Sequence, residues 1–94
     1  MFDAAMAPKG LVSIQRRLHV TGIVQGVGFR PYVWHLAQAL NLAGWVRNDA
    51  AGVEVLVEGD PDAIEAFSRR LPKEIPPLAQ VRGLTWTDGQ ATGE

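Results

Sequence analysis

The stretch Gly22-Ile23-Val24-Gln25-Gly26-Val27-Gly28-Phe29-Arg30 joins a strand pattern on its N-terminal side to a helix pattern on its C-terminal side. Its three glycines lack a Cβ, so the backbone can adopt positive φ angles and another molecule can approach the amides closely. Pro31 follows in the first turn of the expected helix, where the missing N–H of proline costs nothing. We therefore predict a tight strand-to-helix turn.

The start of this predicted helix is a candidate anion site. A helix N-terminus presents unpaired N–H groups and the positive end of the helix dipole. The guanidinium of Arg30 adds a planar fork that can bind two oxygens of one phosphate. We expect a phosphate cradle formed by Gln25, Gly26, Val27, Gly28, Phe29 and Arg30. The alternative is that the glycines only make the turn and that Arg30 binds nothing.

The patterns on either side of the loop predict six elements. Strands are expected where apolar and polar residues alternate, and helices where apolar residues recur at i, i+3, i+4 and i+7, as from Val33 to Leu40. Asn41 or Gly44 is expected to end the first helix, and Trp34 and His35, which lie off its apolar stripe, are expected to be partly exposed packing residues. The predicted strands cover about residues 14–21, 45–48, 53–58 and 79–86, and the helices about 30–40 and 61–71.

Two local details accompany these elements. The apolar parity of the last strand switches across Arg82-Gly83, which predicts a bulge with Gly83 as the residue that permits it. His19 falls on the outward face of the first strand and is expected to be solvated. The order strand, helix, strand, strand, helix, strand predicts an α+β ferredoxin-like sandwich, a split βαβ (βαββαβ) fold with an antiparallel sheet and both helices on one face.

Length and composition set the outer limits of the function. The chain has 94 residues, enough for one domain, and its nine basic and ten acidic residues give a formal net charge of -1. This balance provides no general attraction to nucleic acid or to an acidic membrane, so anion binding must be local. The absence of cysteine excludes a disulfide, a thiolate nucleophile and a cysteine-ligated metal. No signal peptide or membrane span is evident, so the chain is expected to be cytoplasmic.

The same patterns suggest domain boundaries. Residues 1–12 lack periodicity and are expected to form a flexible leader, residues 13–87 the folded domain and residues 88–94 a polar tail.

Ferredoxin-like sandwiches host several functions, some of which these residues exclude. An RNA-recognition domain needs aromatic residues on its third strand, and Val53–Glu58 has none. A copper carrier needs cysteines, and a nucleotide-binding P-loop needs Lys followed by Ser or Thr where this chain has Arg30-Pro31. What remains is a hydrolase of small phosphorylated compounds, or a module that binds the same anion.

Two motifs carry a family resemblance. Gly22 to Arg30 resembles the first signature of the acylphosphatases, and Gly44-Trp45-Val46-Arg47-Asn48, with Gly52 four residues further on, resembles most of the second. The continuation Phe29–Trp34 is similar to one branch of the family, the N-terminal domain of hydrogenase-maturation carbamoyltransferases of the HypF type. The resemblance runs from about Ile14 to Trp86 and implies metal-independent hydrolysis of small acyl phosphates, with carbamoyl phosphate as the substrate in the HypF branch.

The resemblance also assigns roles. It implies that Arg30 and Asn48 are the catalytic residues, with Asn48 orienting the attacking water, a task that suits an amide because it both donates and accepts hydrogen bonds. The alternative for Asn48 is that it only shapes the entry to a hairpin. No cofactor and no metal ion are implied. The implied partners are a small acyl phosphate or inorganic phosphate, and further domains if the chain belongs to a longer HypF-type protein. A free-standing acylphosphatase of broad specificity and a non-catalytic phosphate-binding module remain alternatives.

The sequence departs from the family pattern at two places. The second signature expects a valine and a closing glycine one position later than Val53 and Gly59 stand here, as if one residue were lost after Gly52, which leaves the shape of the hairpin open. Acylphosphatases usually end in a short strand carrying Phe-x-Ile, and this sequence stops where that strand is expected. We therefore expect either a segment of a longer protein or a sheet without its last strand.

Overall fold

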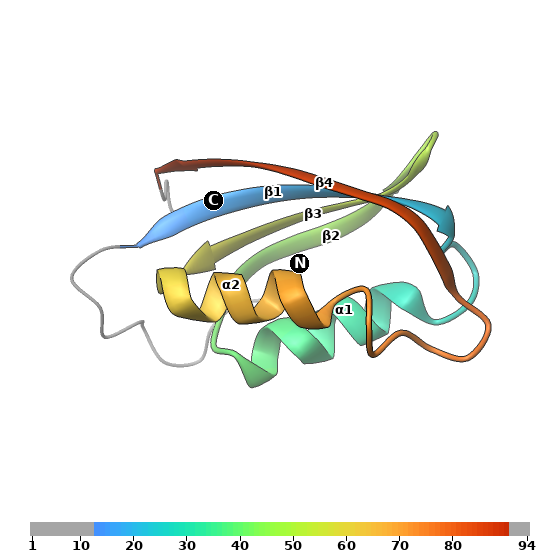
Figure 1. The fold of residues 1–94 in the computed structure, drawn as a ribbon, viewed down its shortest axis with the longest axis horizontal. Helices are drawn as coiled ribbons and strands as arrows, with labels where there is room; N and C mark the ends of the chain where they lie inside the picture. The colour runs from blue at the N-terminus through green and yellow to red at the C-terminus, as the bar shows by residue number, and fades with distance from the viewer. Residues whose placement is uncertain (1–12, 91–94) are drawn as a thin grey trace.

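The computed structural model describes residues 13–90, whose helices and strands follow the predicted order. The elements are β1 (Ile14–Ile23), α1 (Phe29–Ala39), β2 (Ala43–Asp49), β3 (Gly52–Gly59), α2 (Pro61–Arg70) and β4 (Gln80–Gln90). The four strands form one sheet in the order β2-β3-β1-β4, and every neighbouring pair is antiparallel. Both helices lie on the same side of this sheet (Figure 1). The ferredoxin-like prediction is confirmed.

The hydrophobic core lies between the sheet and the two helices. Alternate residues of β1 and β3 face the helices, so that Leu18 pairs with Val55 and Val20 with Val53, and all four side chains are fully buried. Burying a side chain of this size contributes about 1.5–3 kcal/mol. The helices supply the predicted apolar stripes, which are buried at Val33, Leu36 and Ala37 in α1, at Ile64 and Phe67 in α2, and at Leu71 directly after α2.

The first helix ends through Asn41. This residue has a left-handed φ of 56°, and the N–H of the following Leu42 donates to the carbonyl oxygen of Ala37 at 2.9 Å. Of the two predicted stop residues, Asn41 is therefore the one that ends the helix. Gly44 lies inside β2 instead, where a Cβ would overlap the carbonyl oxygen of Leu56.

The predicted bulge is present where β1 meets β4. Thr21 pairs with Gly83 and the next residue, Gly22, pairs with Val81, so Arg82 is the extra residue of β4. Gly83 was predicted to permit the bulge, and it does so without a positive φ, because the positive φ of 126° belongs to Gly22 on the opposite strand. Gly83 supplies room, since a Cβ there would lie 2.6 Å from the hydroxyl oxygen of Thr21.

The last strand is longer than its sequence pattern indicates. β4 runs to Gln90, so residues 88–90, assigned to a polar tail, belong to the sheet. The strand lies at an edge and its final residues are polar, so no apolar alternation marks its end. The expected leader at residues 1–12 and the rest of the tail at residues 91–94 lie outside the described part of the chain.

Arg16, which interrupts the apolar face of β1, is held in a buried polar cluster. Only 3% of the residue is exposed. Its guanidinium donates to both carboxylate oxygens of Asp88, at 2.6 and 2.9 Å. It also donates to the hydroxyl of Ser68 at 2.8 Å and to the carboxylate of Glu65 at 2.9 Å, and it lies over the ring of Trp86. The cluster therefore ties β1 to α2 and to the end of β4, and it satisfies a charge that would otherwise be costly to bury.

We expect the Arg16–Asp88 pair to stabilise the fold at neutral pH but not at acid pH. The hydrogen bond from Arg16, opposed by partial burial, holds the pKa of Asp88 below its ordinary value. Because the folded-state pKa is lower than the unfolded one, this stabilisation is present at neutral pH and is lost as the pH falls below about 4. Asp88→Asn should cost about 1 kcal/mol at pH 7, which in a domain of this size lowers Tm by roughly 4–8 °C.

The test is a series of thermal melts between pH 7 and pH 3. The difference between Asp88→Asn and wild type should shrink as the pH falls. Glu74→Gln is the matched control, because it removes an exposed i,i+4 pair with Arg70 and should change Tm little. Equal losses of Tm in the two variants at every pH would show that the Arg16–Asp88 pair does not stabilise the fold.

Candidate active site

The loop between β1 and α1 depends on two left-handed glycines. Gly26 has φ of 73° and Gly28 has φ of 80°, angles that other L-residues rarely adopt. A Cβ placed on either glycine would meet no atom within 4 Å. The loop therefore needs glycine for its backbone conformation, and the space above it is open. Turns of this kind let neighbouring N–H groups converge on one anion.

Helix α1 begins directly after this loop. Gly28 is its N-cap and offers no side-chain acceptor to the first turn, which also contains no acidic residue. Phe29 is 1% exposed and anchors the helix start in the core, whereas Arg30 is exposed. Among residues 13–90, the guanidinium of Arg30 has no hydrogen-bond or ion-pair partner. The first turn of α1 and the guanidinium of Arg30 thus have no internal side-chain partner among residues 13–90, and the phosphate cradle stays a prediction.

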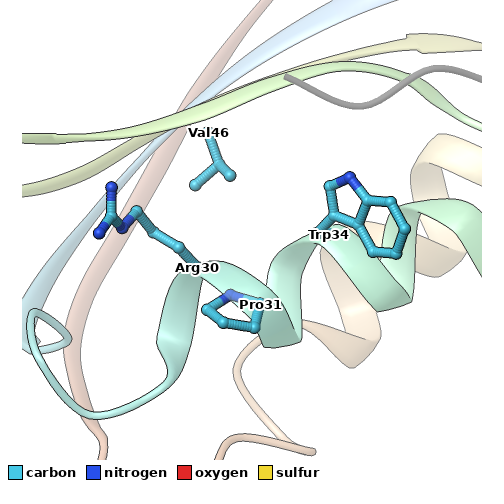
Figure 2. A pocket seen from close by; sticks show the side chains of 4 residues that line it. All are labelled: Arg30, Pro31, Trp34 and Val46. Carbon is cyan, nitrogen blue, oxygen red and sulfur yellow. The ribbon is translucent and has the colours of Figure 1, made fainter.

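Asn48 lies on β2, on the side of the sheet that faces the helices. On β2, Val46 pairs with Val55 and Asn48 with Val53, and both partners belong to the core, so Val46 and Asn48 share the helix-side face. Val46 lines the same hollow as Arg30 (Figure 2). The side chain of Asn48 is exposed and has no hydrogen-bond partner within the described residues. Arg30 and Asn48 therefore lie on one side of the sheet, although the chain separates them by a helix.

Gln25 fastens the loop to the β2–β3 turn. Its side-chain Nε2 donates to the carbonyl oxygens of Asp49 and Gly52, each at 2.8 Å. The loop is thereby linked to the residue that directly follows Asn48. Gln25 was expected to contact phosphate, and the structure uses its side chain internally, which leaves its main-chain N–H for a ligand. Val27 is half-buried and can contribute only through its backbone.

The hairpin after Asn48 has the tight form that the shortened second signature left open. Asp49 pairs with Gly52, so two residues make the turn. One carboxylate oxygen of Asp49 accepts the N–H groups of Ala51 at 2.9 Å and of Gly52 at 2.8 Å. Partial desolvation opposes these bonds, but together they hold the pKa of Asp49 below its ordinary value.

Asp49 also corrects one sequence expectation. Its other carboxylate oxygen lies 2.9 Å from Nε2 of His19, so His19 is paired and not merely solvated. The site residue that sequence reasoning missed is thus Asp49, which shapes the turn next to Asn48. The signal was an Asp three residues before a Gly, a pattern typical of side-chain-capped turns.

Residues 13–90 contain neither a metal-binding cluster nor a membrane-spanning helix. No group of three or more His, Cys, Asp or Glu side chains within residues 13–90 is arranged to hold a metal ion. Neither helix in this part of the chain is long and apolar enough to cross a membrane.

The sequence profile of the family described as Acylphosphatase matches residues 16–94. The chain belongs to the acylphosphatase family. Acylphosphatases are hydrolases that act on acyl phosphates, and the family predicted from the two signatures is confirmed. The matched region contains the glycine loop, Arg30 and Asn48.

Similar proteins come from two kinds of acylphosphatase-like chain. The acylphosphatase of Acidiphilium cryptum is 44% identical over 82 residues, which are 86% of this chain and 89% of that protein. Carbamoyltransferase HypF2 of Cupriavidus necator is 49% identical over 74 residues, 79% of this chain but only 9% of HypF2. A solved full-length HypF in its phosphate- and nucleotide-bound form aligns with 95% of this chain and 11% of its own, at 35% identity and a TM-score of 0.83. This chain therefore spans nearly a whole free-standing acylphosphatase and about a tenth of a HypF protein.

Proposed function

We propose that this chain hydrolyses small acyl phosphates at the site formed by residues 25–29, Arg30 and Asn48. The main support is that two polar side chains have no hydrogen-bond or ion-pair partner among the described residues: Arg30, directly after the loop of left-handed glycines, and Asn48, on the helix-side face of β2. A phosphate bound there would face N–H groups on one side and a guanidinium on the other. Helix N-terminal N–H groups and a guanidinium are the partners that phosphate prefers in proteins, which supports the proposal.

Hydrolysis of an acyl phosphate requires mainly that the site positions the reactants and stabilises the developing charge. An acyl phosphate is a mixed anhydride and already activated, so hydrolysis needs no covalent intermediate. The loop N–H groups and Arg30 hold the phosphoryl oxygens and stabilise the charge that develops on them. Asn48 aligns a water with the phosphorus by donating one hydrogen bond and accepting another. The water oxygen forms a new bond to phosphorus while the P–O bond to the acyl group breaks. A carboxylate leaves, and a phosphoryl oxygen takes one proton of the water.

Carbamoyl phosphate is the substrate that we propose first. Its support is the 49% identity to a protein named a carbamoyltransferase. On this proposal the chain is the acylphosphatase-like part of a HypF-type protein, whose further domains would use the carbamoyl group. The second candidate is a free-standing acylphosphatase of broad specificity, which the 89% coverage of the Acidiphilium cryptum protein favours.

The proposed function predicts turnover that does not depend on a metal ion. Acetyl phosphate and carbamoyl phosphate should be hydrolysed at the same rate with and without excess chelator, and inorganic phosphate should inhibit competitively. Phosphate should also raise Tm above a chloride control of equal ionic strength, because a ligand at about 100 times its Kd stabilises the folded state by roughly 2.7 kcal/mol. Stabilisation by phosphate without turnover would identify a binding module instead. Loss of activity on chelation would contradict the metal-free mechanism.

A further inference from the structure

A hollow begins at Arg30 and runs between α1 and β2 (Figure 2). Its volume is about 310 Å³, and it is lined by Arg30, Pro31, Trp34 and Val46. Arg30 and Trp34 are four residues apart on α1, so they lie on the same side of the helix. Val46 projects from β2 toward the space between them. We call this hollow the acyl groove.

The acyl groove has one charged end and an otherwise apolar lining. Beyond the guanidinium of Arg30, its walls are the ring of Pro31, the side chain of Val46 and the indole of Trp34. Trp34 is 37% exposed and takes no part in the hydrophobic core. Its ring is packed edge-to-face against His35, with ring centroids 5.1 Å apart. A large apolar ring is thus left open to solvent one helical turn from the proposed phosphate site.

We infer that the acyl groove receives the acyl half of the substrate, and that Trp34 favours acyl phosphates with a flat, apolar acyl group. The inference rests on the proposed function, because it takes the phosphate to lie on the loop and on Arg30. With the phosphate fixed there, the groove is the apolar surface that starts at the same guanidinium. Residues one turn apart are separated by roughly 6 Å along a helix. A benzoyl group can bridge that distance, whereas an acetyl or carbamoyl group stops near Val46.

Turnover of three substrates tests this assignment. Trp34→Ala should lower kcat/KM for benzoyl phosphate roughly three- to tenfold more than for acetyl or carbamoyl phosphate, the range expected for one aromatic contact. Competitive inhibition by inorganic phosphate should not change, since phosphate does not reach the indole. Trp34→Phe keeps a flat ring and should retain most of the benzoyl preference. An equal loss on all three substrates would overturn the inference.

Trp86→Ala is the matched control. It also removes a partly exposed indole, 44% exposed, but from β4, which lies at the opposite edge of the sheet from β2. This variant should leave the ratio of benzoyl to acetyl turnover unchanged. A change of that ratio as large as in Trp34→Ala would also overturn the inference, because it would show a general effect of losing an exposed ring.

Binding of non-hydrolysable analogues separates this inference from the proposed function. Phenacylphosphonate and acetonylphosphonate replace the bridging oxygen by carbon, so their affinities, measured by calorimetry, do not depend on catalysis. Phenacylphosphonate should bind about three- to tenfold more tightly to wild type, and Trp34→Ala should abolish the difference. If Trp34→Ala abolishes the preference for phenacylphosphonate but wild type hydrolyses no acyl phosphate, the inference about the groove is supported and the proposed function is wrong. Hydrolysis with no phenacyl preference would refute the groove alone.

Discussion

Arg30→Lys should lower kcat/KM for acyl phosphates by a factor on the order of 10² to 10³, even though the positive charge is kept. The guanidinium fork can bind two phosphoryl oxygens at once, whereas an ammonium group on a flexible stem acts as a point charge. Arg30 is exposed in the first turn of α1 and has no partner among the described residues, so the substitution leaves no internal bond unmade. The folded state should therefore keep its Tm in the absence of ligand.

The phosphate-induced rise in Tm tests the same residue without catalysis. It should be large in wild type and small in both Arg30→Lys and Arg30→Ala. Arg69→Lys is the matched control, because Arg69 is likewise exposed but lies on α2, away from the glycine loop. Equal stabilisation by phosphate in wild type and Arg30→Lys would mean that the loop is not the phosphate site.

The sequence was most informative where structure depends on local periodicity. The apolar stripe of α1 and the alternation in β1 and β3 record which face is buried, because each buried position repeats every turn or every second residue. The glycines of the loop carry a local signal as well, since Gly26 and Gly28 have the positive φ angles that explain glycine there. These features were sufficient to predict the fold and the position of Arg30 in the first turn of α1.

The contacts that support the site could not be predicted, because they join distant segments. Gln25 reaches carbonyl oxygens 24 and 27 residues away, and Arg16 reaches Asp88 across 72 residues. No periodicity encodes such pairs. The position of Trp34 off the apolar stripe indicated that it is partly exposed. That it lines the same hollow as Arg30 follows only from the packing of α1 against β2, which the sequence does not give.

Asn48→Ala should reduce kcat for acyl phosphates by a factor on the order of 10² to 10³, with little change in the inhibition constant of inorganic phosphate. The split follows from the proposed roles, because Asn48 positions the water whereas Arg30 and the loop bind the phosphate. Asn48 has no partner in the described part of the chain, so its loss should not disturb the turn, which Asp49 and Gln25 hold.

Two further variants test whether the effect is specific to the amide of Asn48. Asn48→Asp keeps the shape and the acceptor but cannot donate, and its negative charge would face the bound phosphate, so both turnover and phosphate affinity should fall. Asn41→Gly is the control, since it removes another exposed asparagine while glycine tolerates the left-handed φ of 56° found there. Wild-type kcat in Asn48→Ala would reject the assignment of the water to Asn48. If Asn48→Ala weakened phosphate binding as much as it lowered kcat, Asn48 would instead be part of the anion site.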